Sequence, residues 1–247
     1  MPSAARRDMP AIVFCLTFPA VMTWFYLVVL GSPGDATADP GWAVRSAYGF
    51  GKVVQFTFPA CYVAWFERER LRLTAPTWRG LAFGFGFGVV VALTMLALFF
   101  GWLQTSPPFA DTPAKVYHLV HDMHCATPGR FLMLATFISV PHALLEEYYW
   151  RWFTFGWLRR YAPLWLAVAL SALGFMAHHT ILLDNFFPGH FWTLAAPFSA
   201  GVAIGGAVWA WIYDRTQSLY APWLSHILVD VALMIIGWSM LAPRWDG

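Results

Sequence analysis

The chain has 247 residues, of which 59% are hydrophobic and 11% charged, and its formal net charge at pH 7 is +2. A soluble domain normally carries about 25% charged residues, so this composition excludes a soluble globular protein. The small net charge and the lack of a Lys/Arg run argue against a nucleic-acid partner. We therefore expect an all-α polytopic membrane protein that forms a single domain over residues 1–247 in the lipid bilayer.

Stretches of about 20 apolar residues, the length that crosses a bilayer, recur along the chain. Seven membrane-spanning helices are predicted, at residues 11–30, 46–66, 80–103, 131–150, 161–183, 191–213 and 219–241. The segment 112–127 would be an eighth. It carries Lys115, Asp122 and three His, so we expect it to lie outside the membrane as an amphipathic piece.

Lys and Arg concentrate in cytoplasmic loops of membrane proteins, and this bias orients the chain. With the N-terminus inside, the inner loops and span ends hold Arg6, Arg7, Arg68, Arg70, Arg72, Arg79, Arg151, Arg159, Arg160 and Arg215. The outer ones hold only Arg45, Lys115, Arg130 and Arg244. We predict a cytoplasmic N-terminus and, after seven spans, a C-terminus outside.

Two pairs of glycines lie four residues apart within predicted spans, Gly84 with Gly88 and Gly201 with Gly205. Glycines at this spacing let two membrane helices approach closely. The GFGFG stretch, residues 84–88, has no strand and turn around it, so it does not indicate a dinucleotide-binding loop. Both glycine pairs are predicted to face a neighbouring helix.

Ionisable residues inside spans are the most informative feature, because a central Asp, Lys or Arg costs about 2.5–3.5 kcal/mol on insertion. They fall into four sets: Lys52; Glu146 and Glu147 with Arg151; His178 and His179; and His226 with Asp230. Such residues mark functional sites more often than they fill space. His178 is expected to be a polar neighbour that packs against another helix, and Lys52 is expected to snorkel or to pair with a buried acid.

Spacing within the sets predicts which side chains share a helix face. Glu147 and Arg151 are four residues apart and can pair, whereas Glu146 is rotated about 100° from Glu147 and faces elsewhere. Glu146 and His179 are the same number of residues away from the turn near residue 162. The two should therefore lie at the same height in a helical hairpin. The carboxylate pair and the imidazole are thus predicted to meet.

Three motifs lie in order on separate predicted spans: Glu146-Glu147-x-x-x-Arg151, Phe175-x-x-x-His179 and His226-x-x-x-Asp230. Together they resemble the motifs of the CAAX-protease and bacteriocin-processing (CPBP) family of intramembrane proteases, which has many bacterial members. The resemblance covers roughly residues 134–234, and we predict a catalytic helical core at 130–241. It implies a multi-pass protein of a bacterial cytoplasmic membrane that cleaves a membrane-bound protein or peptide.

The resemblance also implies roles. Glu146 and His179 would activate a water molecule, and a carboxylate kept from water is the stronger base for it. His226 and Asp230 would stabilise the oxyanion. The supporting residues would be Glu147, Arg151 and Phe175.

Asp230 departs from the family pattern, in which Asn is frequent at the last motif position. An ionised Asp230 would repel an oxyanion, so it must be protonated, bind a metal, or orient His226 instead. Three protein ligands and a water form a catalytic zinc site, which His179, His226 and either Glu146 or Asp230 would supply. The HExxH signature is absent, and we predict that no cofactor is required, with zinc as the alternative.

Two other classes of protein fit the same residues. Intramembrane Glu, His and Asp also build proton relays, so a proton-coupled transporter is the main alternative. The inverted repeat and the paired broken helices that many transporters show are not evident here. A non-catalytic membrane scaffold would leave the intramembrane ionisable residues without a purpose.

Overall fold

The computed structural model describes residues 2–31, 41–67 and 74–245, and all regular structure in these ranges is helical. The α-helices are α1 (Pro2–Trp24), α2 (Trp42–Tyr62), α3 (Trp78–Gly101), α4 (Thr112–Asp122), α5 (Pro128–Phe137), α6 (Ala143–Glu147), α7 (Gly156–Tyr161), α8 (Leu164–Phe186), α9 (Ala196–Thr216) and α10 (Tyr220–Leu241). The π-helical segments are η1 (Phe25–Val29), η2 (Val63–Glu67), η5 (Ile138–His142), η6 (Tyr148–Phe155) and η7 (Phe191–Ala195). The 3₁₀ segments are η3 (Leu103–Thr105), η4 (Pro107–Phe109) and η8 (Ala242–Arg244).

Six of the described helical runs are long and apolar enough to cross a membrane, as judged by length and composition. They are Ala4–Val29, Trp78–Thr105, Pro128–Tyr161, Leu164–Phe186, Phe191–Thr216 and Tyr220–Arg244. The chain is therefore an all-α polytopic membrane protein, as its composition predicts. The run formed by α2 and η2 is not among the six, so the predicted count of seven spans remains a prediction.

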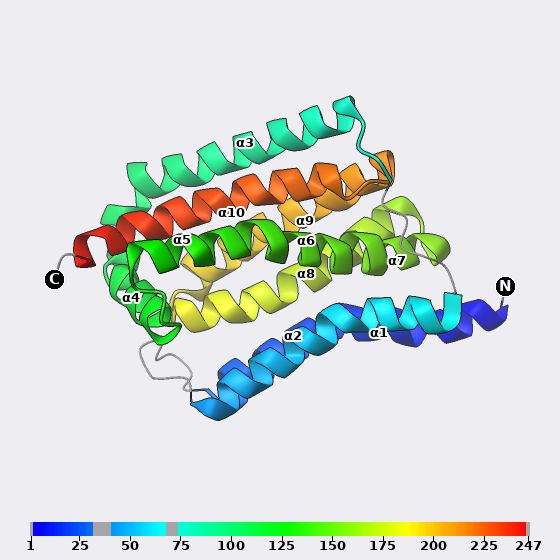
Figure 1. Ribbon diagram of the computed structural model, residues 1–247, viewed down its shortest axis with the longest axis horizontal. Helices are drawn as coiled ribbons and strands as arrows, with labels where there is room; N and C mark the ends of the chain where they lie inside the picture. Colours follow the sequence, from blue (N-terminus) through cyan, green and yellow to red (C-terminus); the bar gives the residue numbers. More distant parts are fainter. Residues whose placement is uncertain (1, 32–40, 68–73, 246–247) are drawn as a thin grey trace.

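The long helical runs lie side by side, and the two chain ends lie at opposite ends of the bundle (Figure 1). Helices α1 and α2 form a hairpin at one side, and α3 lies at the other, packed on α10. Helix α4 has 11 residues. At 1.5 Å per residue it is too short to cross a hydrocarbon core of about 30 Å.

The fourth long run changes helix type four times, and these changes surround the paired glutamates. Pro141 lies in η5, where its ring and its missing N–H disfavour continuous α-helical hydrogen bonding. The short α6 carries Glu146 and Glu147, and η6 follows at once. Because a π-turn holds more residues than an α-turn, each change rotates the side chains that follow. The run still continues to Tyr161.

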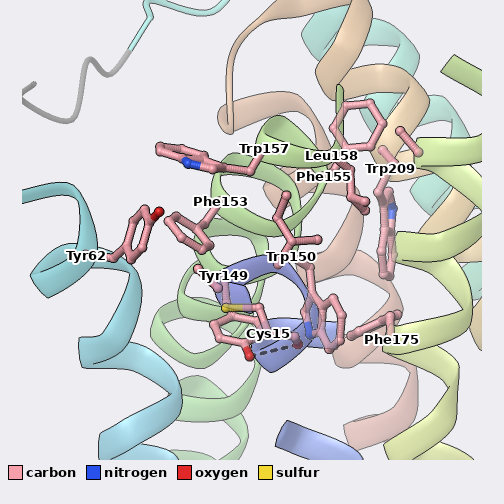
Figure 2. Close-up of a cluster of buried hydrophobic side chains, with 14 of the residues drawn as sticks. Cys15, Tyr62, Tyr149, Trp150, Phe153, Phe155, Trp157, Leu158, Phe175 and Trp209 are labelled. Atoms are coloured by element: carbon pink, nitrogen blue, oxygen red, sulfur yellow. Dashed lines mark hydrogen bonds between the residues drawn. The ribbon is translucent and has the colours of Figure 1, made fainter. Parts of the chain in front are cut away.

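The core next to these glutamates is aromatic (Figure 2). Tyr149, Trp150 and Phe153 have no solvent exposure. Tyr149 donates a hydrogen bond of 2.9 Å to the carbonyl oxygen of Cys15, which ties the fourth run to α1. These aromatic residues lie between the α1–α2 hairpin on one side and Trp209 of α9 on the other. The rigid packing fixes the helix that presents the glutamates.

One of the two predicted glycine contacts is confirmed. A Cβ atom at Gly84 would collide with the carbonyl oxygen of Ala221, and one at Gly88 would lie 2.9 Å from Cα of Ser225, so α3 packs closely on α10. The prediction for the second pair is wrong.

Among the described residues, a Cβ atom at Gly201 would meet no neighbouring helix within 4 Å, and one at Gly205 would meet only Trp209 of its own helix. The close approach in α9 is made by Gly206, whose Cβ position lies 3.1 Å from Phe175 of α8. Adjacent residues on a helix point about 100° apart. The four-residue spacing of Gly201 and Gly205 therefore did not identify the face of α9 that packs on α8.

Candidate active site

The two adjacent glutamates of α6 point to different partners. Glu147 is fully buried, and Glu146 is 4% exposed. Glu146 Oε1 lies 3.9 Å from His142 Nε2, its neighbour four residues earlier, and its Oε2 lies 3.8 Å from His226 Nε2 on α10. The geometry confirms that Glu146 and Glu147 occupy different faces of the helix, as their sequence positions predict.

Glu147 contacts two side chains, the guanidinium of Arg151 and the imidazole of His226. Its Oε2 lies 3.1 Å from Arg151 Nε, which confirms the predicted pair. Its Oε1 lies 2.8 Å from His226 Nδ1. A carboxylate only accepts hydrogen bonds, so the proton of this contact belongs to Nδ1 of the imidazole. Glu147 therefore fixes both the tautomer and the orientation of His226.

Asp230 does not take this orienting role. Its Oδ2 lies 3.7 Å from His226 Nε2, which is longer than a hydrogen bond and is on the opposite side of the ring from Glu147. The sequence left three possible roles for Asp230: a protonated donor, a metal ligand, or a residue that orients His226. The structure assigns the last of these roles to Glu147. His226 Nε2 faces two carboxyl groups, Glu146 and Asp230, at nearly equal distances.

Trp209 is a central contact of the site that the sequence did not reveal. Its indole stacks on the His226 ring with centroids 4.3 Å apart and planes inclined by 18°. Its Nε1 donates a hydrogen bond of 2.9 Å to Ser225 Oγ, which holds the indole in place. Trp209 lies in a predicted span that has no charged residue. The pattern of ionisable residues within the spans therefore did not indicate it.

The same indole contacts the buried guanidinium of Arg151. The Arg151 Cζ atom lies 5.0 Å from the Trp209 ring centroid and 4.7 Å from that of Phe175. Two aromatic faces and the Glu147 carboxylate thus surround this cation, an arrangement that stabilises a charge away from water. Phe175 therefore supports the site by contact with Arg151 as well as with the histidine of its own motif.

His179 is held in a defined state by its own helix. Its Nδ1 lies 2.9 Å from the carbonyl oxygen of Phe175, and a carbonyl only accepts, so Nδ1 carries the proton. The neutral ring then has its lone pair on Nε2 and can take up a proton there. The Phe175 ring packs edge-on against it at 4.7 Å. His179 interacts electrostatically with both Glu146 and His226.

The sequence-predicted residues are thus brought together from three helical runs: Glu146, Glu147 and Arg151 from the fourth, Phe175 and His179 from α8, and His226 and Asp230 from α10. Two further histidines lie beside them. His142 adjoins Glu146, and His178 stacks on Trp150 with parallel rings 5.8 Å apart. Lys52 of α2 also interacts electrostatically with Glu146.

The zinc alternative requires at least three ligand atoms that converge. Within the described ranges, no group of three His, Cys, Asp or Glu side chains has the arrangement to hold a metal ion. The Nδ1 atoms of both candidate histidines donate to Glu147 and to a backbone carbonyl, so only their Nε2 atoms could bind a metal. The described residues therefore give no support to a zinc site, and we derive no chemical step through a metal.

Comparison with known proteins adds one finding. Residues 128–232 match the family model described as type II CAAX prenyl endopeptidase Rce1-like. This segment contains all seven residues of the three motifs. No curated protein and no solved structure matches the chain.

Proposed function

We propose that the protein is an intramembrane endopeptidase with a glutamate-type mechanism, because residues 128–232 match a family model of CAAX endopeptidases. Its substrate would be a membrane-bound protein or peptide, since the site lies among apolar helices. Residues 130–241 would form the catalytic core. The multi-pass chain would have its N-terminus in the cytoplasm of a bacterial cell.

One observation carries the proposal: Glu146 Oε2 and Asp230 Oδ2 lie 3.8 and 3.7 Å from the same atom, His226 Nε2. These separations are too long for direct hydrogen bonds. They suit a water molecule or a substrate carbonyl oxygen that bridges the groups. A carboxylate, a fixed imidazole and a second carboxyl group then surround one reacting atom.

Glu146 would act as the general base. As the water oxygen forms its bond to the scissile carbonyl carbon, Glu146 takes up the water proton. His179 has its Nε2 lone pair available for the same task, because its Nδ1 carries the proton. The proton then passes to the amide nitrogen of the substrate, the C–N bond breaks, and the amine leaves.

His226 and Asp230 would stabilise the negative oxygen of the tetrahedral intermediate. His226 would donate from Nε2 as an imidazolium, whose charge Glu147 balances across the ring at 2.8 Å. Asp230 must be protonated to donate to an anion. Trp209, which stacks on His226, and Arg151, which pairs with Glu147, would not contact the reacting atoms themselves. They hold His226 and Glu147 in position.

The test compares membrane proteomes of cells that carry the wild-type protein, Glu146→Ala or Asp122→Asn. Asp122 lies on α4 outside the site, so this variant serves as the control for loss of a carboxylate. We expect one or more uncut membrane precursors to accumulate with Glu146→Ala alone. A transporter or a scaffold would leave precursor lengths the same in all three strains, and that result would overturn the proposal.

A further inference from the structure

His142 lies beside the proposed general base but belongs to none of the three motifs. Within the described ranges, two imidazoles come within ion-pair distance of a Glu146 oxygen, His142 at 3.9 Å and His226 at 3.8 Å. His179, the histidine of the second motif, is not one of them. His142 is the last residue of η5, a π-helical segment, and such segments are frequent at functional sites. Its position is therefore that of a participant in the reaction.

The two imidazoles contact different oxygens of Glu146. Oε2 faces His226 Nε2, which also lies 3.7 Å from Asp230, so the two groups that would hold the oxyanion are on this side. Oε1 faces His142 Nε2. In a tetrahedral intermediate the oxyanion and the departing nitrogen are bound to one carbon and point in different directions. When the oxyanion contacts His226, the nitrogen is directed away from it, and His142 is the proton-carrying side chain on the other side of the base.

The surroundings of His142 suit a group that accepts and releases protons. Its side chain is 22% exposed, compared with 6% for His226, so a substrate can reach it. Within the described residues its ring nitrogens form no hydrogen bond, whereas Nδ1 of His226 is bound to Glu147. Its ring packs against the Phe56 ring of α2, with the centroids 6.0 Å apart and the planes nearly perpendicular. Packing thus positions His142 while both nitrogens can exchange a proton.

Hydrolysis of an amide requires such a donor. An amine anion is a poor leaving group, so the amide nitrogen must gain a proton as the C–N bond breaks. His226 would be engaged at that moment by the oxyanion and by Glu147. Glu146 would already hold the proton taken from water, and its Oε1 is the oxygen that faces His142. The proton that must move and the side chain that can pass it on are therefore neighbours.

We propose that His142 is a further catalytic residue, the general acid that protonates the leaving nitrogen. This inference rests on the proposed function. The imidazolium gives its Nε2 proton to the amide nitrogen, the C–N bond breaks with its electron pair on nitrogen, the oxyanion collapses to a carbonyl, and the amine leaves. Glu146 then passes the water proton from Oε1 to His142 Nε2, which restores both groups. The 3.9 Å between these atoms would shorten with substrate bound, as catalytic contacts commonly do.

The test uses purified full-length proteins in detergent and, as substrate, the uncut precursor purified from cells that carry Glu146→Ala. His142→Phe keeps a ring against Phe56 and removes the proton carrier, and His142→Ala leaves space for an added ring. His121→Ala on α4, whose side chain is 63% exposed, is the control for loss of a histidine. Cleavage by His142→Ala is measured with imidazole or with pyrazole. The two rings have the same size, and only imidazole carries a proton at neutral pH.

We expect both His142 variants to cleave about 10²–10⁴-fold more slowly than the wild type and to unfold at its temperature. Imidazole should restore part of the His142→Ala rate, pyrazole should not, and His121→Ala should match the wild type. Equal effects of the two rings, whether both rescue or neither does, would overturn the inference, as would a wild-type rate for His142→Phe. If His142→Phe does not fold, His142→Gln decides in its place by the same criterion.

Failure of the proposed function would give a different result. In that case no precursor accumulates with Glu146→Ala, or the purified wild type leaves it uncut. The role of His142 fails alone when the wild type cuts the precursor, Glu146→Ala does not, and His142→Phe cuts it at the wild-type rate.

Discussion

Glu147 Oε1 lies 2.8 Å from His226 Nδ1, so the carboxylate that pairs with Arg151 also orients a histidine on a different helix. The fourth run and α10 are therefore connected at the site by a charged hydrogen bond. Such bonds are shorter and about twice as strong as neutral ones. Glu147 links the position of Arg151 to the state of His226, and its replacement should affect both.

Glu147→Gln should therefore lower stability as well as activity. The neutral amide leaves the buried Arg151 without a counter-charge, and breaking a buried pair typically costs about 3–5 kcal/mol. The amide can also present its NH₂ group to His226 Nδ1 and reverse the tautomer. Arg151→Met should destabilise the fold similarly, since it leaves Glu147 unpaired. Thermal unfolding in detergent is the measurement, and unfolding temperatures equal to that of the wild type would contradict the role.

Glu146→Gln should behave differently, and it is the matched comparison for Glu147→Gln. Among the residues that the structure describes, no Arg or Lys forms a direct ion pair with Glu146, which lies 3.9 Å from His142 and 3.8 Å from His226. The amide has the same shape but is not a base. We expect cleavage to fall about 10²–10⁴-fold, the usual contribution of a general base. Unfolding temperature should stay close to that of the wild type, and equal destabilisation by both glutamine variants would contradict the division of roles.

Contacts within one helix could be predicted from the sequence because they follow from the helical period. The Glu147–Arg151 pair and the contact of Phe175 with His179 are both four residues apart, and both are present. The order of the three motifs also indicated that separate helices would meet. These predictions needed only local geometry and the cost of charge in a membrane.

Contacts between helices depend on how each helix is rotated, and the sequence does not specify that rotation. The bond from Glu147 to His226 and the stack of Trp209 on His226 both join different runs. The π-helical segments around α6 add rotations that a regular period does not include. For the same reason Gly206, rather than Gly201 or Gly205, meets α8.

Helix α3 packs closely on α10, the helix that carries His226. Gly88→Leu should force the helices apart, because a Cβ there already lies 2.9 Å from Cα of Ser225, the residue before His226. Overpacking of this kind typically costs about 1–3 kcal/mol. Gly86→Leu is the control, since a Cβ atom there would meet no neighbouring helix within 4 Å in the part of the chain that the structure describes. We expect lower unfolding temperature and cleavage for the first variant only. Identical behaviour of both would show that this packing does not support the site.

The predicted topology can be tested with reporters fused at three positions. Tags near Arg160 and Arg72 should be cytoplasmic, and a tag near Lys115 should be outside. Arg68, Arg70 and Arg72 lie outside the described residues, so this part of the prediction rests on the sequence. A tag at Arg72 on the opposite side of the membrane from the N-terminus would indicate that the run Trp42–Glu67 does not cross the membrane. The predicted seven spans would then be six. That outcome would reverse the orientation of every later helix.

Asp230→Asn tests both the unusual motif residue and the metal question. If Asp230 is protonated and donates to the oxyanion, the amide of Asn keeps a donor near His226 Nε2, from which Asp230 Oδ2 is 3.7 Å distant. Cleavage should then stay within about tenfold of the wild type, because removing one oxyanion donor outright costs about 10²–10³-fold. The activity of both proteins should also survive strong chelators.

A zinc ligand at this position would give the opposite pattern. The amide is a poor zinc ligand, so Asp230→Asn would lose activity by orders of magnitude and regain part of it with added zinc. Chelators would then also inactivate the wild type. Asp230→Ala separates the two explanations further, since it removes both donor and ligand. If Asn and Ala variants are equally inactive and zinc rescues only the Asn variant, Asp230 binds a metal, and the metal-free mechanism built on Glu146 is wrong.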